Sequence, residues 1–221
     1  MNVRRNRPRE DATTLLEVIV LVAVMAVVAA MLLPPVSRSK VYSRRVACVN
    51  NLKNVGLADR IFSTDHNGNY PWMLGGTNGT KDAVDDPTQL WRHFAIVSNE
   101  LSTPKILVCP SDPERTVAPN FASFGPGNLS YFLGLQSSEE EPQSIMAGDR
   151  NLMTNGVSVG PGTLRLSTNL NFGFTKRLHD GTGNIVLGDG SVQQVTGGRF
   201  QQAEVDAALA STNGVNRLLI P

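Results

Sequence analysis

The pattern of hydrophobic and polar positions separates the front of the chain from the rest. Residues 15–33 form a continuous apolar run in which Glu17 is the only charge. As a helix this run would span roughly 28 Å, enough to cross the hydrocarbon core of a membrane. Beyond Pro34 and Pro35, apolar residues recur every three or four positions from Tyr42 to Ile61, which is typical of an amphipathic helix. The pattern therefore predicts one long N-terminal helix with an apolar first part and an amphipathic second part.

After Ser63 the pattern changes to short apolar runs separated by turn residues. Asp65, Asn67, Gly68 and Pro71 favour the end of the helix here. The later runs are three to five residues long, as in the strands of an antiparallel sheet, and a short closing helix is expected at residues 201–209. The strand candidates are residues 106–109, 129–133, 145–147, 164–166 and 171–174.

One β-hairpin is predicted near the C-terminus. Residues 184–187 and 191–195 are strand-like, and the glycines that flank Asp189 supply the positive φ that a tight turn needs. His179 precedes this hairpin and could hydrogen-bond to the turn or to the Asp189 carboxylate, as a buried structural histidine. A metal ligand is the alternative. Catalysis by Ser191, His179 and Asp189 or Asp180 is disfavoured, because Ser191 lacks the G-x-S-x-G context of a nucleophile elbow.

Composition narrows the classes of function. Twenty Lys and Arg balance nineteen Asp and Glu, so no net positive field attracts nucleic acid. Two cysteines are too few for a paired-cysteine zinc site, and we expect no metal and no cofactor. In an oxidising compartment Cys48 and Cys109 could form a disulfide that ties the helix to the later domain. The alternative is two buried free thiols.

Three interpretations of the apolar run compete. A cleaved secretory signal has a shorter apolar stretch and a small-residue cleavage site behind it. A plain membrane anchor explains the length but leaves Glu17 without a role, although a carboxylate at bilayer depth is costly and is usually functional. The third interpretation gives Glu17 a partner, and it follows from a resemblance.

The segment TTLLEVIVLVAVMAVVAAMLLPP, residues 13–35, resembles the N-terminal segment of type IV pilins and type II secretion pseudopilins. Three further stretches resemble a large pilin-like family: residues 44–71, LVCPSDP at 107–113, and a His followed after nine residues by Asp-Gly. Here these are His179, Asp189 and Gly190. The resemblance implies cleavage between Ala12 and Thr13 by a prepilin peptidase, methylation of Thr13, and neutralisation of a neighbouring subunit's amino terminus by Glu17. Ala12 and Thr13 replace the usual Gly and Phe.

The resemblance implies an α+β, pilin-like fold in which a long N-terminal helix, transmembrane and then amphipathic, packs on a small antiparallel β-sheet domain. Its expected parts are a leader, a membrane and filament-core helix, an amphipathic continuation and a β-rich periplasmic domain, at residues 1–12, 13–35, 36–62 and 63–221. Expected partners are the prepilin peptidase, other pilin-like subunits, the inner-membrane assembly platform and membrane lipid.

The implied function is that of a non-enzymatic structural subunit of a pseudopilus or type IV pilus-like filament. Its implied location is the bacterial inner membrane, crossed once, with the C-terminal domain in the periplasm. The alternative is a membrane-anchored periplasmic binding or sensing module. A large apolar pocket would favour that alternative.

Overall fold

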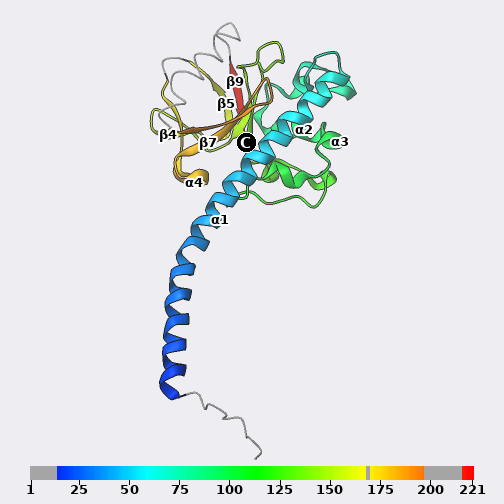
Figure 1. Cartoon of the computed structure of the whole chain (residues 1–221). Coiled ribbons are helices and arrows are strands. Elements are labelled where there is room, and N and C mark those ends of the chain that lie inside the picture. The colour runs from blue at the N-terminus through cyan, green and yellow to red at the C-terminus, as the bar shows by residue number, and fades with distance from the viewer. Residues whose placement is uncertain (1–13, 168–169, 197–215) are drawn as a thin grey trace, which may run out of the picture. The chain divides into compact units, whose positions relative to one another are not determined.

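The computed structural model describes residues 14–167, 170–196 and 216–221. The chain divides into two compact units after Ser43, and the first helix, α1 (Leu15–Asp65), contributes to both. Figure 1 shows α1 in blue and cyan, followed by the elements of the second unit. The closing helix predicted at residues 201–209 and the leader at residues 1–12 lie outside the described residues.

The first unit contains the apolar part of α1, and here a prediction is wrong. Within the part of the chain that the structure describes, no helix is long and apolar enough to cross a membrane. The apolar stretch with described side chains covers 17 residues, about 25 Å of helix, whereas a spanning helix needs about 20 apolar residues to cross about 30 Å. The predicted transmembrane helix is contradicted, and so is the single-pass inner-membrane location that depended on it.

The end of α1 agrees with the predicted turn chemistry. Asn67 and Gly68 both have positive φ, 56° and 81°. The Gly68 N–H donates to the Ser63 carbonyl oxygen at 2.8 Å, which satisfies one of the last carbonyls of the helix. The helix therefore ends two residues beyond the predicted Ser63.

The second unit contains two antiparallel sheets. The larger has six strands in the order β5-β9-β1-β2-β7-β8, and the smaller has three in the order β4-β3-β6. The predicted hairpin is confirmed as β7 and β8, with Thr182 opposite Thr196 and Val186 opposite Val192. The strands are β1 (Tyr131–Gly134), β2 (Ile145–Asp149), β3 (Leu152–Thr154), β4 (Val157–Ser158), β5 (Gly162–Arg165), β6 (Phe172–Phe174), β7 (Thr182–Leu187), β8 (Val192–Thr196) and β9 (Arg217–Ile220).

The four inner strands of the six-stranded sheet, β9, β1, β2 and β7, are buried on both faces, which explains their largely apolar sequences. Successive residues of β7 alternate between two cores: Val186 packs with α1, whereas Ile185 and Leu187 pack with the three-stranded sheet. An antiparallel sheet with one solvated face would show polar residues at every second position. The unit is therefore a three-layer arrangement of α1 and short helices, the large sheet, and the small sheet.

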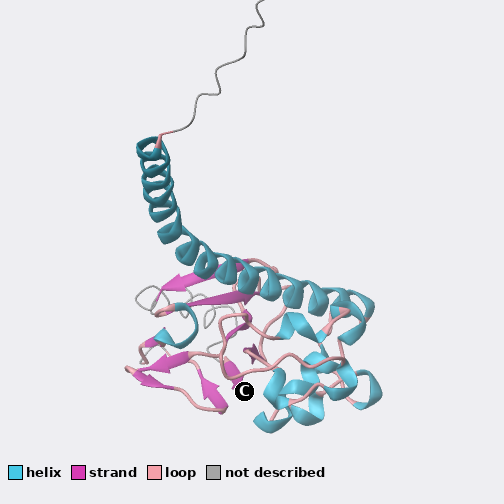
Figure 2. Cartoon of the chain, turned by 90° about the horizontal axis from the view of Figure 1, so that it is seen from below, coloured by secondary structure: helices cyan, strands magenta, loops and turns pink. Residues whose placement is uncertain are grey.

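Short helices and 3-10 turns occupy residues 71–128, where the sequence analysis expected few elements. Figure 2 shows the strands gathered on one side of this unit and most of the short helices on the other. The strand predicted at residues 106–109 is wrong, because Pro104 starts a 3-10 turn there, capped by the Thr103 side chain. These elements are α2 (Leu90–Ala95) and α3 (Ser98–Leu101), with 3-10 turns η1 (Pro71–Met73), η2 (Gly76–Asn78), η3 (Lys81–Ala83), η4 (Pro87–Gln89), η5 (Pro104–Leu107), η6 (Phe121–Ser123) and η7 (Pro126–Asn128); a further short helix, α4 (Lys176–His179), precedes β7.

The fold class is therefore α+β, but the predicted architecture needs correction. The predicted small sheet is a six-stranded sheet covered by a second, three-stranded sheet. The predicted transmembrane portion of the helix is not supported within the described residues. The compact second unit begins at Arg44, so it includes much of the predicted amphipathic helix.

Candidate functional site

Glu17 lies in the first turn of α1 and bonds to the residue that caps the helix. Its Oε2 accepts hydrogen bonds from the Thr14 backbone N–H at 2.9 Å and from the Thr14 hydroxyl at 3.1 Å. In return the Thr14 hydroxyl oxygen accepts from the Glu17 N–H at 3.4 Å. This reciprocal pair is a capping box, in which a carboxylate also complements the positive end of the helix dipole. Ala12 and Thr13, the predicted cleavage site, lie outside the described residues.

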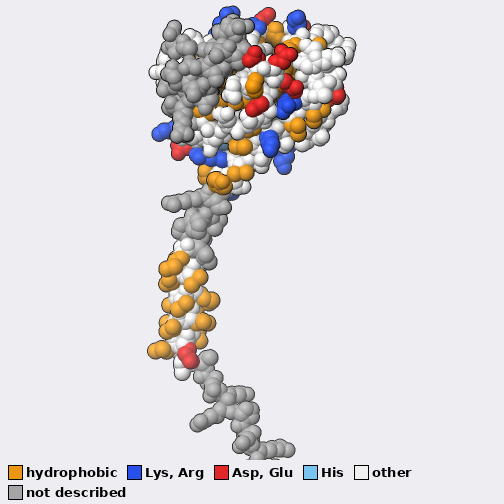
Figure 3. Space-filling model, turned by 45° about the horizontal axis from the view of Figure 1, so that its top comes forward, with side chains coloured by type: hydrophobic (Ala, Val, Ile, Leu, Met, Phe, Trp, Pro, Cys, Tyr) orange, Lys and Arg blue, Asp and Glu red, His pale blue; other side chains and the backbone are white. Residues whose placement is uncertain are grey.

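The helix that follows exposes apolar side chains all round. The large hydrophobic residues between Leu15 and Met31 are 49% to 80% exposed. Figure 3 shows apolar side chains along the visible face of this segment. A helix that is hydrophobic on every side is normally buried in a larger structure. This segment therefore needs a covering surface that the single chain does not supply within its described residues.

His179 is the second candidate, and it lies in a buried cluster rather than against the hairpin turn. Its Nε2 is 3.3 Å from the Cys109 Sγ and 3.3 Å from Oδ2 of Asp149. Cys48 and Cys109 form a disulfide, which is one of the two alternatives that the sequence left open. The same Asp149 oxygen accepts from the backbone N–H and the side-chain amide of Asn184, both at 2.8 Å.

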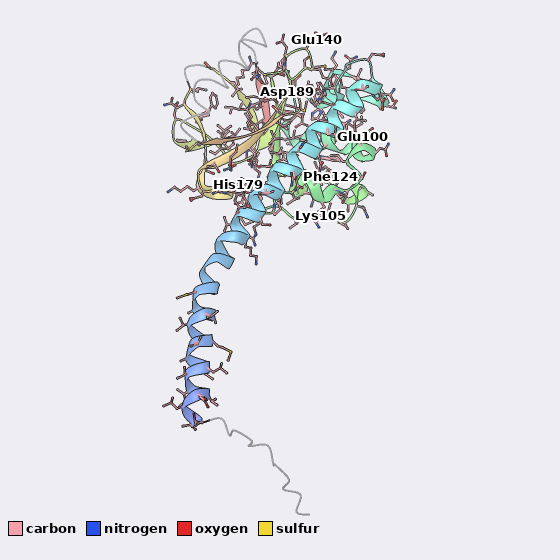
Figure 4. All side chains as sticks on the ribbon, viewed as in Figure 1. Glu100, Lys105, Phe124, Glu140, His179 and Asp189 are labelled. Atoms are coloured by element: carbon pink, nitrogen blue, oxygen red, sulfur yellow. A yellow bond between two sulfur atoms is a disulfide. The ribbon has the colours of Figure 1, made fainter. Side chains whose placement is uncertain are left out.

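Asp189 and Gly190 form the turn at the opposite end of β7. The Asp189 carboxylate accepts from the Ser191 backbone N–H at 2.8 Å, and Gly190 has φ 81°. The described residues form no bond between His179 and Asp189, although one was expected. His179 contacts Asp149 at one end of β7, whereas Asp189 bonds to Ser191 at the other end (Figure 4). The structure therefore does not bring Ser191, His179 and Asp189 together as a triad.

Both ends of this motif are attached to α1. The Arg45 guanidinium donates to the His179 carbonyl oxygen at 3.0 Å, and the Arg60 guanidinium donates to the Asp189 carbonyl oxygen at 2.8 Å. Between them, Gly56 packs so closely on the sheet that an added Cβ would lie 2.6 Å from a methyl group of Val186. The motif thus holds the β7–β8 hairpin on the helix, and its arrangement is structural.

Sequence reasoning missed the residues that complete this arrangement. Asp149, Asn184, Arg45 and Arg60 are far apart in sequence, and nothing in their spacing indicates that they converge. The capping box was different, since Thr14-Leu-Leu-Glu17 has the T-x-x-E pattern before an apolar run that signals one. That signal was available in the sequence.

A second buried polar group surrounds Arg150. Its guanidinium donates to both carboxylate oxygens of Asp112, at 2.7 and 2.8 Å, and to Glu114 at 2.7 Å. Glu114 also pairs with Arg177. Burial alone would raise the pKa of Asp112, but the hydrogen bonds from Arg150 and other donors hold that pKa below its usual value. The network is a structural one that joins the LVCPSDP segment to the residue that follows β2.

A third buried group is Asp59, in the part of α1 that belongs to the second unit. Its side chain is 1% exposed, and neither carboxylate oxygen has a partner among the described residues. Burial raises the pKa of Asp59 well above its usual value, and the charge of Glu100 adds to the shift. The protonated acid is therefore the form that this environment favours.

A pocket of ligand size lies beside Trp91 on the surface of the second unit. It has a volume of about 390 Å³ and a mainly apolar wall. Trp91 and Leu129 form part of it, and Arg115 is its charged residue. The remaining lining residues are Pro87, Thr88, Leu90, Pro126, Pro161, Gly162 and Pro221. Its size falls in the range of small-molecule sites.

Comparison with known proteins does not extend this picture. No family model matches the chain, and no curated protein or solved structure matches it significantly.

Proposed function

We propose that this protein is a structural subunit of a filament of the type II secretion or type IV pilus kind. The observation that carries the proposal is the first part of α1, whose large apolar side chains are about half exposed or more on every side. In a filament, the same segment of neighbouring subunits would cover these side chains. No catalytic residue is required for this role.

The hydrophobic effect favours such an assembly. Burying a Val, Leu, Ile or Met side chain contributes about 1.5–3 kcal/mol, and twelve large apolar residues of this segment are exposed. Much of that gain is offset by the entropy lost on association. The hydrophobic contribution therefore favours packing between copies of the helix.

Processing and register complete the proposal. A prepilin peptidase cuts between Ala12 and Thr13, and the new amino group of Thr13 pairs with Glu17 of a neighbouring subunit. A buried amine and a buried carboxylate are each costly alone, whereas together they form a charge-assisted hydrogen bond. The capping box competes with this pairing, because Thr14 already bonds to Oε2 of Glu17.

Substitutions at Glu17 separate the two roles. Glu17→Gln retains a side chain that can complete a capping box but removes the charge. We expect Glu17→Gln and Glu17→Ala to impair filament entry, measured by immunogold electron microscopy of sheared filaments and by cross-linking in the producing cells. Thr14→Ala is the matched control: it weakens the cap, leaves the carboxylate, and should assemble.

Normal assembly of the Glu17→Gln variant would contradict the proposed ion pair, and Glu17 would then act only as a helix cap. If Thr14→Ala failed to assemble while Glu17→Gln assembled normally, the result would also contradict the ion pair and favour the helix cap.

The pocket beside Trp91 favours a second candidate, a small-molecule-binding module. Its apolar wall and single cation suit a small apolar ligand with an acidic group. Native mass spectrometry of the purified protein would detect such a ligand. Retention of a ligand by the wild type and its loss from Trp91→Ala would favour this candidate over the filament role.

A further inference from the structure

The cluster around His179 contains more metal-ligating chemistry than a structural disulfide requires. The ligand atoms of Cys48, Cys109 and His179 lie within 4.8 Å of one another. Asp149 adds a carboxylate oxygen 3.3 Å from the His179 Nε2. Cys48, Cys109 and Asp149 are fully buried and His179 is 2% exposed. Three residues from separate segments of the chain thus come together in the core, and a fourth, Asp149, contacts the histidine.

We propose that reduction of the Cys48–Cys109 disulfide converts this cluster into a tetrahedral zinc site. The ligands are the two thiolates, Nε2 of His179 and Oδ2 of Asp149. Sulfur and imidazole ligands in a tetrahedral set select zinc over the oxygen-preferring calcium and magnesium. The site would be independent of the filament role, because all four ligands belong to the second compact unit.

Two of the ligand separations fit the edges of a zinc tetrahedron. Zinc bonds of about 2.3 Å to sulfur and about 2.0–2.1 Å to nitrogen and oxygen place sulfur and nitrogen ligands roughly 3.5 Å apart, and nitrogen and oxygen ligands roughly 3.3 Å apart. The corresponding separations here are 3.3 Å from Cys109 to His179 and 3.3 Å from His179 to Asp149. Cys48 must turn away from Cys109 once their bond is broken. The Asp149 carboxylate must also approach the two sulfur atoms, because it is not in the group of ligand atoms that lie within 4.8 Å of one another.

Charge also permits the site. Two thiolates, one carboxylate and Zn²⁺ leave one formal negative charge in the core. The Arg45 guanidinium, which donates to the His179 carbonyl oxygen at 3.0 Å, is positioned to compensate it. The Arg45 Nε is itself buried and without a partner among the described residues. Oδ2 of Asp149 is further fixed by the two hydrogen bonds from Asn184, as an outer shell fixes a metal ligand.

The chemistry balances with a dithiol as the reductant. Two electrons and two protons pass from the dithiol to the protein disulfide, which gives two protein thiols and the oxidised dithiol. Zinc then displaces one proton from each thiol as the two Zn–S bonds form. The metal would join α1 to the LVCPSDP segment and α4, which is the connection that the disulfide makes under oxidising conditions.

The test uses the full chain, reduced with a non-chelating phosphine and compared with the oxidised chain. We expect the reduced protein to bind one zinc ion per chain, measured by a colorimetric chelator assay, and the oxidised protein to bind none. Cobalt(II) in place of zinc should give the intense visible absorption of tetrahedral thiolate coordination. Zinc should also raise the melting temperature of the reduced protein.

Variants distinguish this site from zinc held by the two thiols alone. His179→Ala and Asp149→Asn should each weaken zinc binding by at least about tenfold, whereas His66→Ala, a substitution of another histidine near the end of α1, should not. Circular dichroism before and after zinc shows whether the reduced chain is folded when it binds. Absent stoichiometric binding, unchanged affinity in His179→Ala or Asp149→Asn, or binding without native circular dichroism would overturn the proposal.

Discussion

At the scale of single residues, the second unit depends on charged groups that are buried with their partners. Arg150 and Asp112 are the clearest pair, because two parallel hydrogen bonds join them and the Ser130 hydroxyl donates to Asp112 at 2.9 Å. A bidentate pair of this kind is well compensated while intact. Its loss leaves one buried charge without a counter-ion.

We therefore expect Arg150→Ala to lower the free energy of unfolding by about 3–5 kcal/mol, measured by urea denaturation. The matched control is Arg92→Ala, which removes an exposed pair with Asp82 and should change stability little. Equal effects of the two substitutions would contradict the structural role assigned to Arg150.

The buried side chain of His93 predicts that the stability of the fold depends on pH. Its side chain is 1% exposed, and burial lowers its pKa from 6.5 to about 4. The unfolded state therefore takes up the proton first as the pH falls. The His93 contribution to stability is complete above pH 6.5 and decreases between pH 6.5 and 4, by up to about 3 kcal/mol.

Denaturation of the wild type and of His93→Gln across this pH range isolates the contribution, since other acids titrate in both proteins. The difference between the two should shrink or reverse towards pH 4. A constant difference would show that His93 is not the responsible group.

At the scale of elements, the packing of α1 on β7 positions both halves of the His and Asp-Gly motif. Arg45 and Arg60 hold the two ends, and Gly56 allows close contact in the middle. The motif therefore fixes the β7–β8 hairpin to α1. This role requires no chemical reactivity of the histidine or the aspartate.

A larger side chain at Gly56 should disturb the close packing of α1 on β7. We expect Gly56→Leu to cost about 1–3 kcal/mol, because the fully buried Val186 side chain or the helix would have to shift to make room. Leucine is a good helix former, so helix propensity does not explain a loss. Asn54→Leu, on the exposed side of the same helix, is the control and should be close to neutral. Similar melting temperatures for both variants would refute the close contact.

Local patterns predicted several of these elements but not their layers. The glycines around Asp189 marked the β7–β8 turn, and the apolar runs marked β1, β2, β5 and β6. The run at residues 106–109 misled, because Pro104 and the Thr103 cap favour a 3-10 turn over a strand. The three-stranded sheet was not predicted as a separate layer, since a buried apolar run has the same composition whichever layer covers it.

At the scale of the whole molecule, the cluster around His179 is formed by contacts between segments that are distant in the sequence. Disulfide formation between Cys48 and Cys109 was one of two open alternatives, because sequence does not show whether two thiols meet. His179 was expected at the hairpin turn and instead lies against Asp149, which belongs to a strand 30 residues earlier. Both outcomes depend on tertiary contacts, which cannot be predicted from the local pattern of hydrophobic and polar residues.

The first unit raises a different question, because its apolar helix lacks a covering surface among the described residues. The proposed packing with copies of itself in a filament would supply that surface. The proposal depends on maturation, since Glu17 needs the new amino group at Thr13 as its partner. Maturation is therefore the step on which the proposed function can be tested first.

Mass spectrometry of the N-terminus of the protein isolated from cells that produce it tests this claim most directly. The proposed function predicts a chain that begins at Thr13 and carries an N-methyl group. A chain that retains Met1, or one that begins beyond Pro35, would contradict it.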